Sequence, residues 1–143
     1  MTYEIKNYSK MYKFANMVID TKFLIYETDL SFAFTNLKPA LEGHILVCPK
    51  RCVQYFHELT DEEKIDLSKS MMHVGKVMKE ILNKKFITMT IQDGPLSGQT
   101  VPHVHGHIFV RNNQNERFCS KPVPEQKRIE YSALYRSYFE KYQ

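Results

Sequence analysis

The chain has 143 residues, of which 43% are hydrophobic and 25% charged, so its length and composition fit one globular domain and exclude a disordered or fibrous chain. The formal net charge is +4 without a run of five like charges, which suits either an anionic ligand or a solvated surface and speaks against a nucleic-acid partner. No apolar run approaches a membrane helix, and three cysteines without a signal peptide predict free thiols in the cytoplasm, with the nucleus as the alternative.

The N-terminal part of the sequence is typical of a hairpin-rich antiparallel segment. Residues 1–11 are polar and predict an N-terminal extension to a single domain over 12–143. Short strands are expected where β-branched and aromatic residues lie between turn signals, at 12–17, 22–27, 30–35 and 44–48.

One long helix is expected after these strands. Thr60 and Glu63 match a capping box at its start, and Asn83 is a plausible end. An apolar stripe at spacings of three and four predicts about six turns, through Leu67, Met71, Val74, Met78 and Ile81. Gly75 weakens a helix interior and therefore predicts a close approach to the sheet.

The C-terminal part adds two strands, a loop and a second helix. Strands are expected at 86–91 and 103–110, separated by a loop at 93–98. Residues 112–127 are polar and predict a mobile loop. A final helix with a tyrosine-lined face is indicated by Tyr131, Leu134, Tyr135, Tyr138 and Tyr142.

Half of the chain's six histidines lie at strict period two, at His103, His105 and His107. On a β-strand this spacing places all three imidazoles on one face. Imidazole is a base, a nucleophile or a metal ligand near neutral pH. The candidate functional site is therefore this segment.

Three interpretations of the histidine segment stay open. Histidines two apart on a strand can bind zinc, although no Asp, Glu or Cys lies nearby at ligand spacing. The histidines could also be structural. The third interpretation is nucleophilic catalysis at phosphorus, in which His105 attacks while His103 and His107 flank the phosphoryl oxygens.

The segment before the histidines suits a phosphate chain. Gly98, Gln99, Thr100 and Val101 can offer backbone N–H groups, an amide and a hydroxyl to phosphate oxygens. Gly98 is also the residue type that permits close approach of the backbone to a ligand. These residues favour the third interpretation.

The sequence His103-Val104-His105-Gly106-His107-Ile108, preceded by Gln92-Asp93-Gly94 and Gly98-Gln99-Thr100-Val101, resembles the signature of the histidine triad family. The segments at 31–39 and 43–49 resemble the family's N-terminal half, and the match covers roughly residues 12–111. It is most similar to the fragile histidine triad branch, the dinucleoside triphosphate hydrolases. The resemblance implies an α+β domain with a five-stranded, mainly antiparallel sheet, a long helix and a C-terminal helix.

The resemblance also implies residue roles. His105 corresponds to the nucleophile that forms a nucleotidyl-histidine intermediate, and His103 and His107 to the outer triad positions. His44 corresponds to a fourth, supporting histidine. The implied substrate-binding positions are Asn36 at the ribose, Phe34 and Leu46 at the nucleobase, and Gln92 and Gln99 at the phosphates.

Two residues depart from the family pattern. Gly106 occupies a position that is usually aliphatic, on the strand face opposite the histidines, so core packing is expected to change more than chemistry. Met17 replaces a residue that is commonly polar or histidine near the substrate, which leaves base recognition open.

The implied reaction is hydrolysis of dinucleoside polyphosphates, ApppA in particular, to AMP and the remaining nucleotide. The alternatives are a nucleoside phosphoramidate hydrolase and a nucleotide-binding signalling module with slow turnover. No protein-bound metal or cofactor is expected, although magnesium can accompany the substrate. A homodimer is expected, without nucleic-acid or membrane partners.

Overall fold

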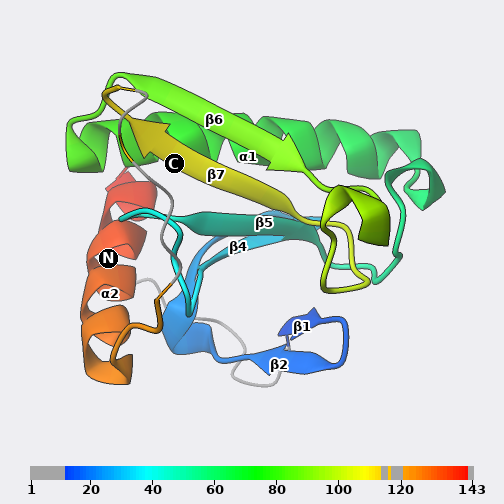
Figure 1. Ribbon diagram of the computed structural model, residues 1–143, viewed down its shortest axis with the longest axis horizontal. Coiled ribbons are helices and arrows are strands. Elements are labelled where there is room, and N and C mark those ends of the chain that lie inside the picture. The colour runs from blue at the N-terminus through cyan, green and yellow to red at the C-terminus, as the bar shows by residue number, and fades with distance from the viewer. Residues whose placement is uncertain (1–11, 114–115, 117–120, 142–143) are drawn as a thin grey trace.

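A computed structural model describes residues 12–113, 116 and 121–141. The expected extension at 1–11 lies outside this part, as do 114–115 and 117–120 of the expected loop and Tyr142 of the final helix. The described chain contains a five-stranded antiparallel sheet in the order β3-β4-β5-β7-β6 (Figure 1). The strands are β3 (Leu24–Glu27), β4 (Ser31–Thr35), β5 (Ile45–Pro49), β6 (Phe86–Ile91) and β7 (Gly106–Arg111). The predicted α+β class is confirmed.

The N-terminal strand predicted over 12–17 is wrong, because the chain turns back within it. Strands β1 (Tyr12–Phe14) and β2 (Met17–Ile19) pair as a separate antiparallel hairpin. Its turn holds Ala15 in the left-handed region, at φ 53°, a conformation that the residue types gave no reason to expect. A short 3-10 helix, η1 (Thr21–Phe23), then replaces the predicted start of the next strand.

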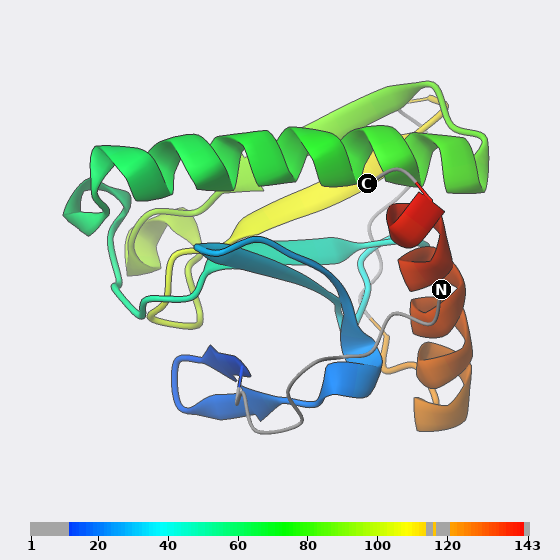
Figure 2. The ribbon, with the colours of Figure 1, turned by 180° about the vertical axis from the view of Figure 1, so that it is seen from behind.

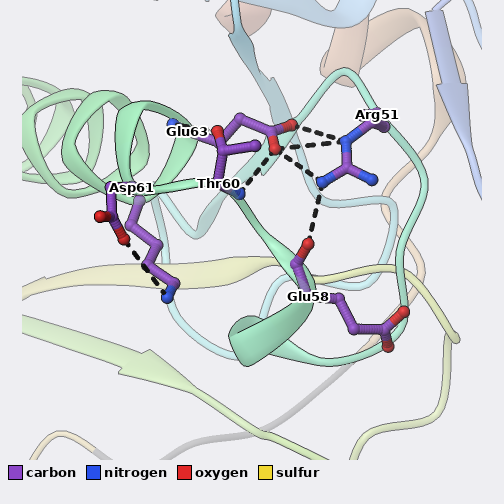
Figure 3. Close-up of polar contacts among 6 residues, drawn as sticks. Arg51, Glu58, Thr60, Asp61 and Glu63 are labelled. Carbon is purple, nitrogen blue, oxygen red and sulfur yellow. Dashed lines mark hydrogen bonds and ion pairs between the residues drawn. The ribbon is translucent and has the colours of Figure 1, made fainter.

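Helix α1 (Asp61–Leu82) begins and ends where the sequence predicts. The Thr60 hydroxyl accepts the Glu63 N–H at 3.1 Å, and the Glu63 carboxylate accepts the Thr60 N–H at 2.9 Å. Arg51 donates to the same carboxylate at 2.7 Å (Figure 3). Asn83 ends the helix in the left-handed conformation. The helix start is thereby tied to the segment that follows β5.

Two glycines allow α1 to lie close to the sheet. A Cβ atom at Gly75 would approach the Ile87 Cγ2 atom to 2.8 Å, so the predicted close approach is confirmed. A Cβ atom at Gly106 would approach the Met71 sulfur to 2.6 Å. The Gly106 position therefore faces α1 and affects core packing, as the sequence predicted.

The sheet separates two cores. One lies between the sheet, α1 and α2 (Glu125–Lys141) and includes Ile45, Leu67, Val74 and Ile108. The other lies between the opposite face and the β1–β2 hairpin, and contains Tyr12, Phe14, Leu24, Phe32, Phe34, Leu46 and Cys48. Figure 2 shows α1 above the sheet and the hairpin below it. The second core is where the histidines converge.

Helix α2 starts at Glu125, so the helix begins within the expected loop at 112–127. Three side chains of α2 hold it against strands β3 and β4. The Arg136 guanidinium donates to the Leu24 carbonyl at 2.7 Å, and that of Arg128 to the Thr35 carbonyl at 2.7 Å. Ser132 shares a 2.8 Å hydrogen bond with the Thr35 hydroxyl.

Among the described residues, neither α1 nor α2 is long and apolar enough to cross a membrane.

Candidate active site

The histidine segment enters β7 later than predicted. Strand β7 starts at Gly106, so His103 and His105 lie in the preceding loop and only His107 belongs to the strand. The reason is a tight turn in which the His103 N–H donates to the Val101 carbonyl at 2.8 Å. The Val104 N–H then donates to the Val53 carbonyl, also at 2.8 Å. The prediction of a strand over 103–110 is thus wrong at its first three residues.

His103 is fully buried and both of its ring nitrogens are engaged. Its Nδ1 accepts the Ala15 N–H at 2.9 Å. Because a backbone N–H can only donate, Nδ1 must carry the lone pair and the proton must reside on Nε2. That Nε2–H donates to the Pro49 carbonyl at 2.7 Å. His103 therefore ties the hairpin to the end of β5.

The same residue orients His105 through its backbone. The His105 Nδ1 lies 2.7 Å from the His103 carbonyl oxygen, which can only accept, so His105 carries its proton on Nδ1. Its Nε2 consequently carries the lone pair. No hydrogen bond to this Nε2 is found among the described residues. His105 thus presents a nucleophilic nitrogen with a fixed ring orientation.

A second chain of hydrogen bonds sets the proton on His107. The Ala40 N–H donates to His44 Nδ1 at 3.1 Å, so the proton of His44 resides on Nε2. That Nε2–H donates to His107 Nδ1 at 2.9 Å, which leaves the proton of His107 on Nε2. This Nε2–H is buried and has no partner within the described chain. The rings of His105 and His107 lie 4.9 Å apart, so a free lone pair lies close to a free donor.

Burial keeps the four imidazoles neutral. It lowers the pKa of His105 and of His103 below the ordinary value of 6.5. The pKa of His107 falls to about 4, first through burial and then through the charge on His105. The pKa of His44 falls to about 3 through burial and the two neighbouring histidines. The lone pair of His105 is therefore available at neutral pH.

Phe14 is a site residue that the sequence did not single out. Its ring meets the His105 ring edge-on, at 4.8 Å between centroids and 85° between planes. It also lies 5.5 Å from the His103 ring and 5.5 Å from Phe34. Only the tertiary contact of the hairpin with the sheet brings it there. No pattern in the sequence could have identified it.

The residues expected at a nucleoside lie around this cluster. Phe34 and Leu46 are buried partners across β4 and β5 in the second core. Asn36 lies beside His44, with 3.4 Å between its Nδ2 and the His44 Nδ1, while its Oδ1 accepts the Lys38 N–H. Asn36 is therefore a turn residue at the border of the histidine cluster. Its role at a ribose stays a prediction.

The phosphate-binding prediction falls on a compact loop at 92–101. The Gln99 amide is used inside this loop, because its oxygen accepts the Gly94 N–H and its nitrogen donates to the Gln54 carbonyl, both at 2.9 Å. Gln92 lies over Gly98, which has φ 93° and where a Cβ atom would come within 2.5 Å of the Gln92 amide nitrogen. Gln92 is thus better placed than Gln99 to meet a ligand.

The last two residues of the loop differ in exposure. Thr100 is exposed, whereas Val101 is half-buried against the second core. Residues 98–101 directly precede the histidine segment. Their contacts with phosphate remain predictions.

The metal-binding interpretation conflicts with the positions of the protons. His103 has no free lone pair, because its Nδ1 accepts the Ala15 N–H and its Nε2 carries a proton. The Nδ1 of His107 likewise accepts from His44. Over the described ranges, no group of three or more histidine, cysteine or acidic side chains is arranged to hold a metal ion.

Comparison with known proteins supports the same family. Residues 18–114 match the HIT domain. Curated relatives include a bifunctional bis(5'-adenosyl)-triphosphatase/adenylylsulfatase of Arabidopsis thaliana, 46% identical over 70% of this chain and 56% of the relative. A bis(5'-adenosyl)-triphosphatase of Dictyostelium discoideum is 51% identical over 62% of this chain and 59% of the relative. The chain thus spans less than two thirds of the length of these relatives.

Solved structures agree with the sequence relatives. The Plasmodium falciparum diadenosine triphosphate hydrolase superposes with a TM-score of 0.85 at 31% identity, over 95% of this chain and 88% of that one. The NitFhit protein of C. elegans superposes with a TM-score of 0.84 at 37% identity, over 92% of this chain and 31% of that one. From the matched domain, the relatives and the four-histidine cluster, we conclude that the chain belongs to the histidine triad family, in its fragile histidine triad branch.

Proposed function

We propose that the protein hydrolyses dinucleoside polyphosphates, with ApppA as the preferred type, to AMP and the remaining nucleotide. One observation carries the proposal: a free lone pair on His105 Nε2 next to an unpartnered N–H on His107 Nε2. The names of the relatives from Arabidopsis, Dictyostelium and Plasmodium support this substrate class.

In the first step, His105 Nε2 attacks the α-phosphorus. A phosphorus–nitrogen bond forms, and the bond to the bridging oxygen breaks with its electron pair on the departing nucleotide. The His107 N–H donates a hydrogen bond to that oxygen. The carbonyl of His103 stabilises the developing positive charge on the His105 ring, because it accepts the Nδ1–H at 2.7 Å.

In the second step, a water oxygen attacks the phosphorus of the intermediate. The phosphorus–nitrogen bond breaks and its electron pair returns to His105 Nε2. The attacking water releases one proton to the solvent, and AMP leaves. Dividing the reaction in two replaces one difficult displacement by two easier ones. Magnesium carried by the substrate neutralises the leaving phosphates, and no protein-bound cofactor takes part in this scheme.

The decisive assay compares ApppA, AppppA and adenosine phosphoramidate in parallel, with product analysis and single-turnover rates. Fastest cleavage of ApppA to AMP and ADP supports the proposal. Fastest cleavage of the phosphoramidate would replace it by the alternative hydrolase activity. Cleavage slower than the dissociation of bound nucleotide would favour the signalling module, in which the complex itself is the output.

We propose further that the protein is a homodimer joined through β6 and α1. Strand β6 is an outer strand of the described sheet and carries exposed Phe86 and Met89, at 63% and 42% exposure. Exposed apolar edges favour pairing with another chain. Light scattering should give twice the chain mass, and Met89→Lys should lower it, whereas Met17→Lys on the hairpin should not. A monomer at every concentration contradicts the proposal.

The expected cytoplasmic location, inferred from unpaired cysteines, also remains a proposal.

A further inference from the structure

A cavity of about 460 Å³ lies between helix α2 and the segment that follows β4. The segment and the helix lie side by side in Figure 1, at the end of the sheet that is next to α2. One wall is formed by Pro39, Glu42, Gly43 and His44, and the other by Val123 and the inner face of α2. The volume falls within the range of small-molecule sites. His44 lines the cavity, whereas His103, His105 and His107 do not, so the cavity lies beside the histidine cluster and shares one residue with it.

The cavity offers flat apolar walls. The rings of Tyr131 and Tyr135 lie 5.4 Å apart and 31° from parallel, and both line it. Leu134 lines it as well and is 53% exposed. Aromatic faces of this kind favour a planar ring as ligand.

The cavity also contains a polar group without a partner. Tyr135 is 3% exposed and no hydrogen bond to its hydroxyl is found in the described part of the chain, but the hydroxyl oxygen is not among the fully enclosed unpartnered atoms. The hydroxyl is therefore accessible to a ligand in the cavity. Burial raises the pKa of Tyr135 well above its ordinary value, with the nearby Glu42 charge as the second cause, so the phenol keeps its proton and remains a donor.

Glu42 supplies the complementary acceptor. It lines the cavity, is exposed, and forms no ion pair with another described residue. A phenol O–H beside a carboxylate pairs with a ring edge that presents an acceptor next to a donor. The Watson–Crick edge of adenine has this arrangement, with N1 next to the 6-amino group.

We propose that this cavity is a second nucleoside site, which takes a planar ring carrying a donor beside an acceptor, with adenine as the representative. Tyr135 donates to the ring acceptor, Glu42 accepts from the amino group, and the ring lies against Tyr131. The cavity depends on the proposed function only for the source of its ligand, because cleavage of ApppA releases AMP.

The test uses adenosine and inosine on the full chain labelled with ring-¹³C tyrosine and ring-¹³C histidine. Inosine keeps the size of the ring but reverses the donor and the acceptor on that edge. NMR signals of Tyr131 and Tyr135, assigned through the Phe variants, report on the cavity, and His105 signals report on the catalytic centre. We expect the tyrosine chemical shifts to report a Kd for adenosine on the order of 0.1 mM, as is typical of a ligand of this size. Inosine should bind at least about tenfold more weakly.

Three variants sharpen the result. Glu42→Gln and Tyr135→Phe should each weaken the Tyr131 response to adenosine about tenfold and leave the His105 response and kcat unchanged. Tyr138→Phe removes a hydroxyl on the same helix outside the cavity and should change neither response. A Tyr131 signal that stays still up to about 5 mM adenosine, or that responds equally to inosine, overturns the inference.

The outcomes separate this inference from the proposed function. Turnover of ApppA without any response of Tyr131 leaves the function in place and removes the second site. A selective response of Tyr131 without turnover keeps the site and removes the function. A Tyr131 response that follows the His105 response in every variant shows transmission from the catalytic centre and overturns the second site.

Discussion

The backbone N–H of Ala15 donates to Nδ1 of His103 at 2.9 Å, across 88 positions of sequence. This single bond determines on which nitrogen His103 carries its proton. It also fastens the β1–β2 hairpin, whose Phe14 ring packs edge-on against His105, to the segment that holds the proposed nucleophile. The hairpin is thus part of the framework of the candidate active site although it contributes no strand to the five-stranded sheet.

The first prediction concerns the loss of this connection. His103→Ala should destabilise the fold by about 2–4 kcal/mol, because it leaves the Ala15 N–H and the Pro49 carbonyl without partners and opens a buried cavity. Urea unfolding measures the change. The matched variant His57→Ala, at an exposed position, should stay within about 0.5 kcal/mol of the parent. Equal stability of the two variants contradicts the structural role of His103.

The second prediction is that His103 and His105 carry their protons on opposite nitrogens. The hydrogen bonds place the proton of His103 on Nε2 and that of His105 on Nδ1. Long-range ¹H–¹⁵N NMR of the imidazole rings above pH 7 distinguishes the two forms. His44 and His107 should both show the Nε2–H form. A His105 signal in the Nε2–H form would remove the free lone pair on which the mechanism depends.

The third prediction tests the nucleophile. His105→Ala should lower turnover of ApppA by about 10³-fold or more, with the substrate Kd within tenfold, because binding rests on other groups. Acid-labile, base-stable labelled AMP should appear on His105 of the parent during turnover. The adduct distinguishes covalent catalysis from direct attack by water. Activity of the variant within tenfold of the parent contradicts the assignment.

The fourth prediction concerns pH. Burial lowers the pKa of His105 below 6.5, so in the free enzyme the neutral nucleophile persists below this pH. The kcat/KM for ApppA should therefore stay level near neutral pH and fall only below about 6.5. Circular dichroism over the same range separates protonation from acid unfolding. An acid limb of the kcat/KM profile with its midpoint clearly above pH 6.5 would contradict the burial of the His105 imidazole.

The fifth prediction concerns the start of α1. The pKa of Glu63 is lowered to about 2, mainly by its hydrogen bond from Arg51. A carboxyl whose pKa is lower in the folded state stabilises the fold above the unfolded pKa of about 4.3, and this contribution is lost as the pH falls through about 2. Glu63→Gln keeps the acceptor for the Thr60 N–H but loses the charge. It should cost about 1 kcal/mol at pH 7, since Arg51 is half exposed.

Urea unfolding at several pH values checks this expectation. The difference between Glu63→Gln and the parent should shrink as the pH falls toward 2, where the parent carboxyl is half protonated. Glu62→Gln changes an exposed neighbour in the same helical turn and serves as the control. A cost that is independent of pH would mean that Glu63 acts only as a helix cap.

Local patterns in the sequence were sufficient for much of the fold and for locating the candidate site at the histidine segment. The capping box of Thr60 and Glu63 predicted the start of α1, since both hydrogen bonds form within one helical turn. Gly75 predicted the contact with the sheet. The period-two histidines and their surroundings predicted the family through their resemblance to its signature, and the matched HIT domain confirms that prediction.

Other features depended on contacts between distant segments. The turn at Ala15, the departure of His103 from β7 and the use of the Gln99 amide inside its own loop all result from hydrogen bonds that form only in the folded chain. Period two could place the imidazoles near one another but could not decide which nitrogen of each ring is free. The backbone groups of Ala15, Ala40 and His103 determine which ring nitrogen carries the proton. The reason is that a group that can only donate or only accept fixes the position of its partner's proton.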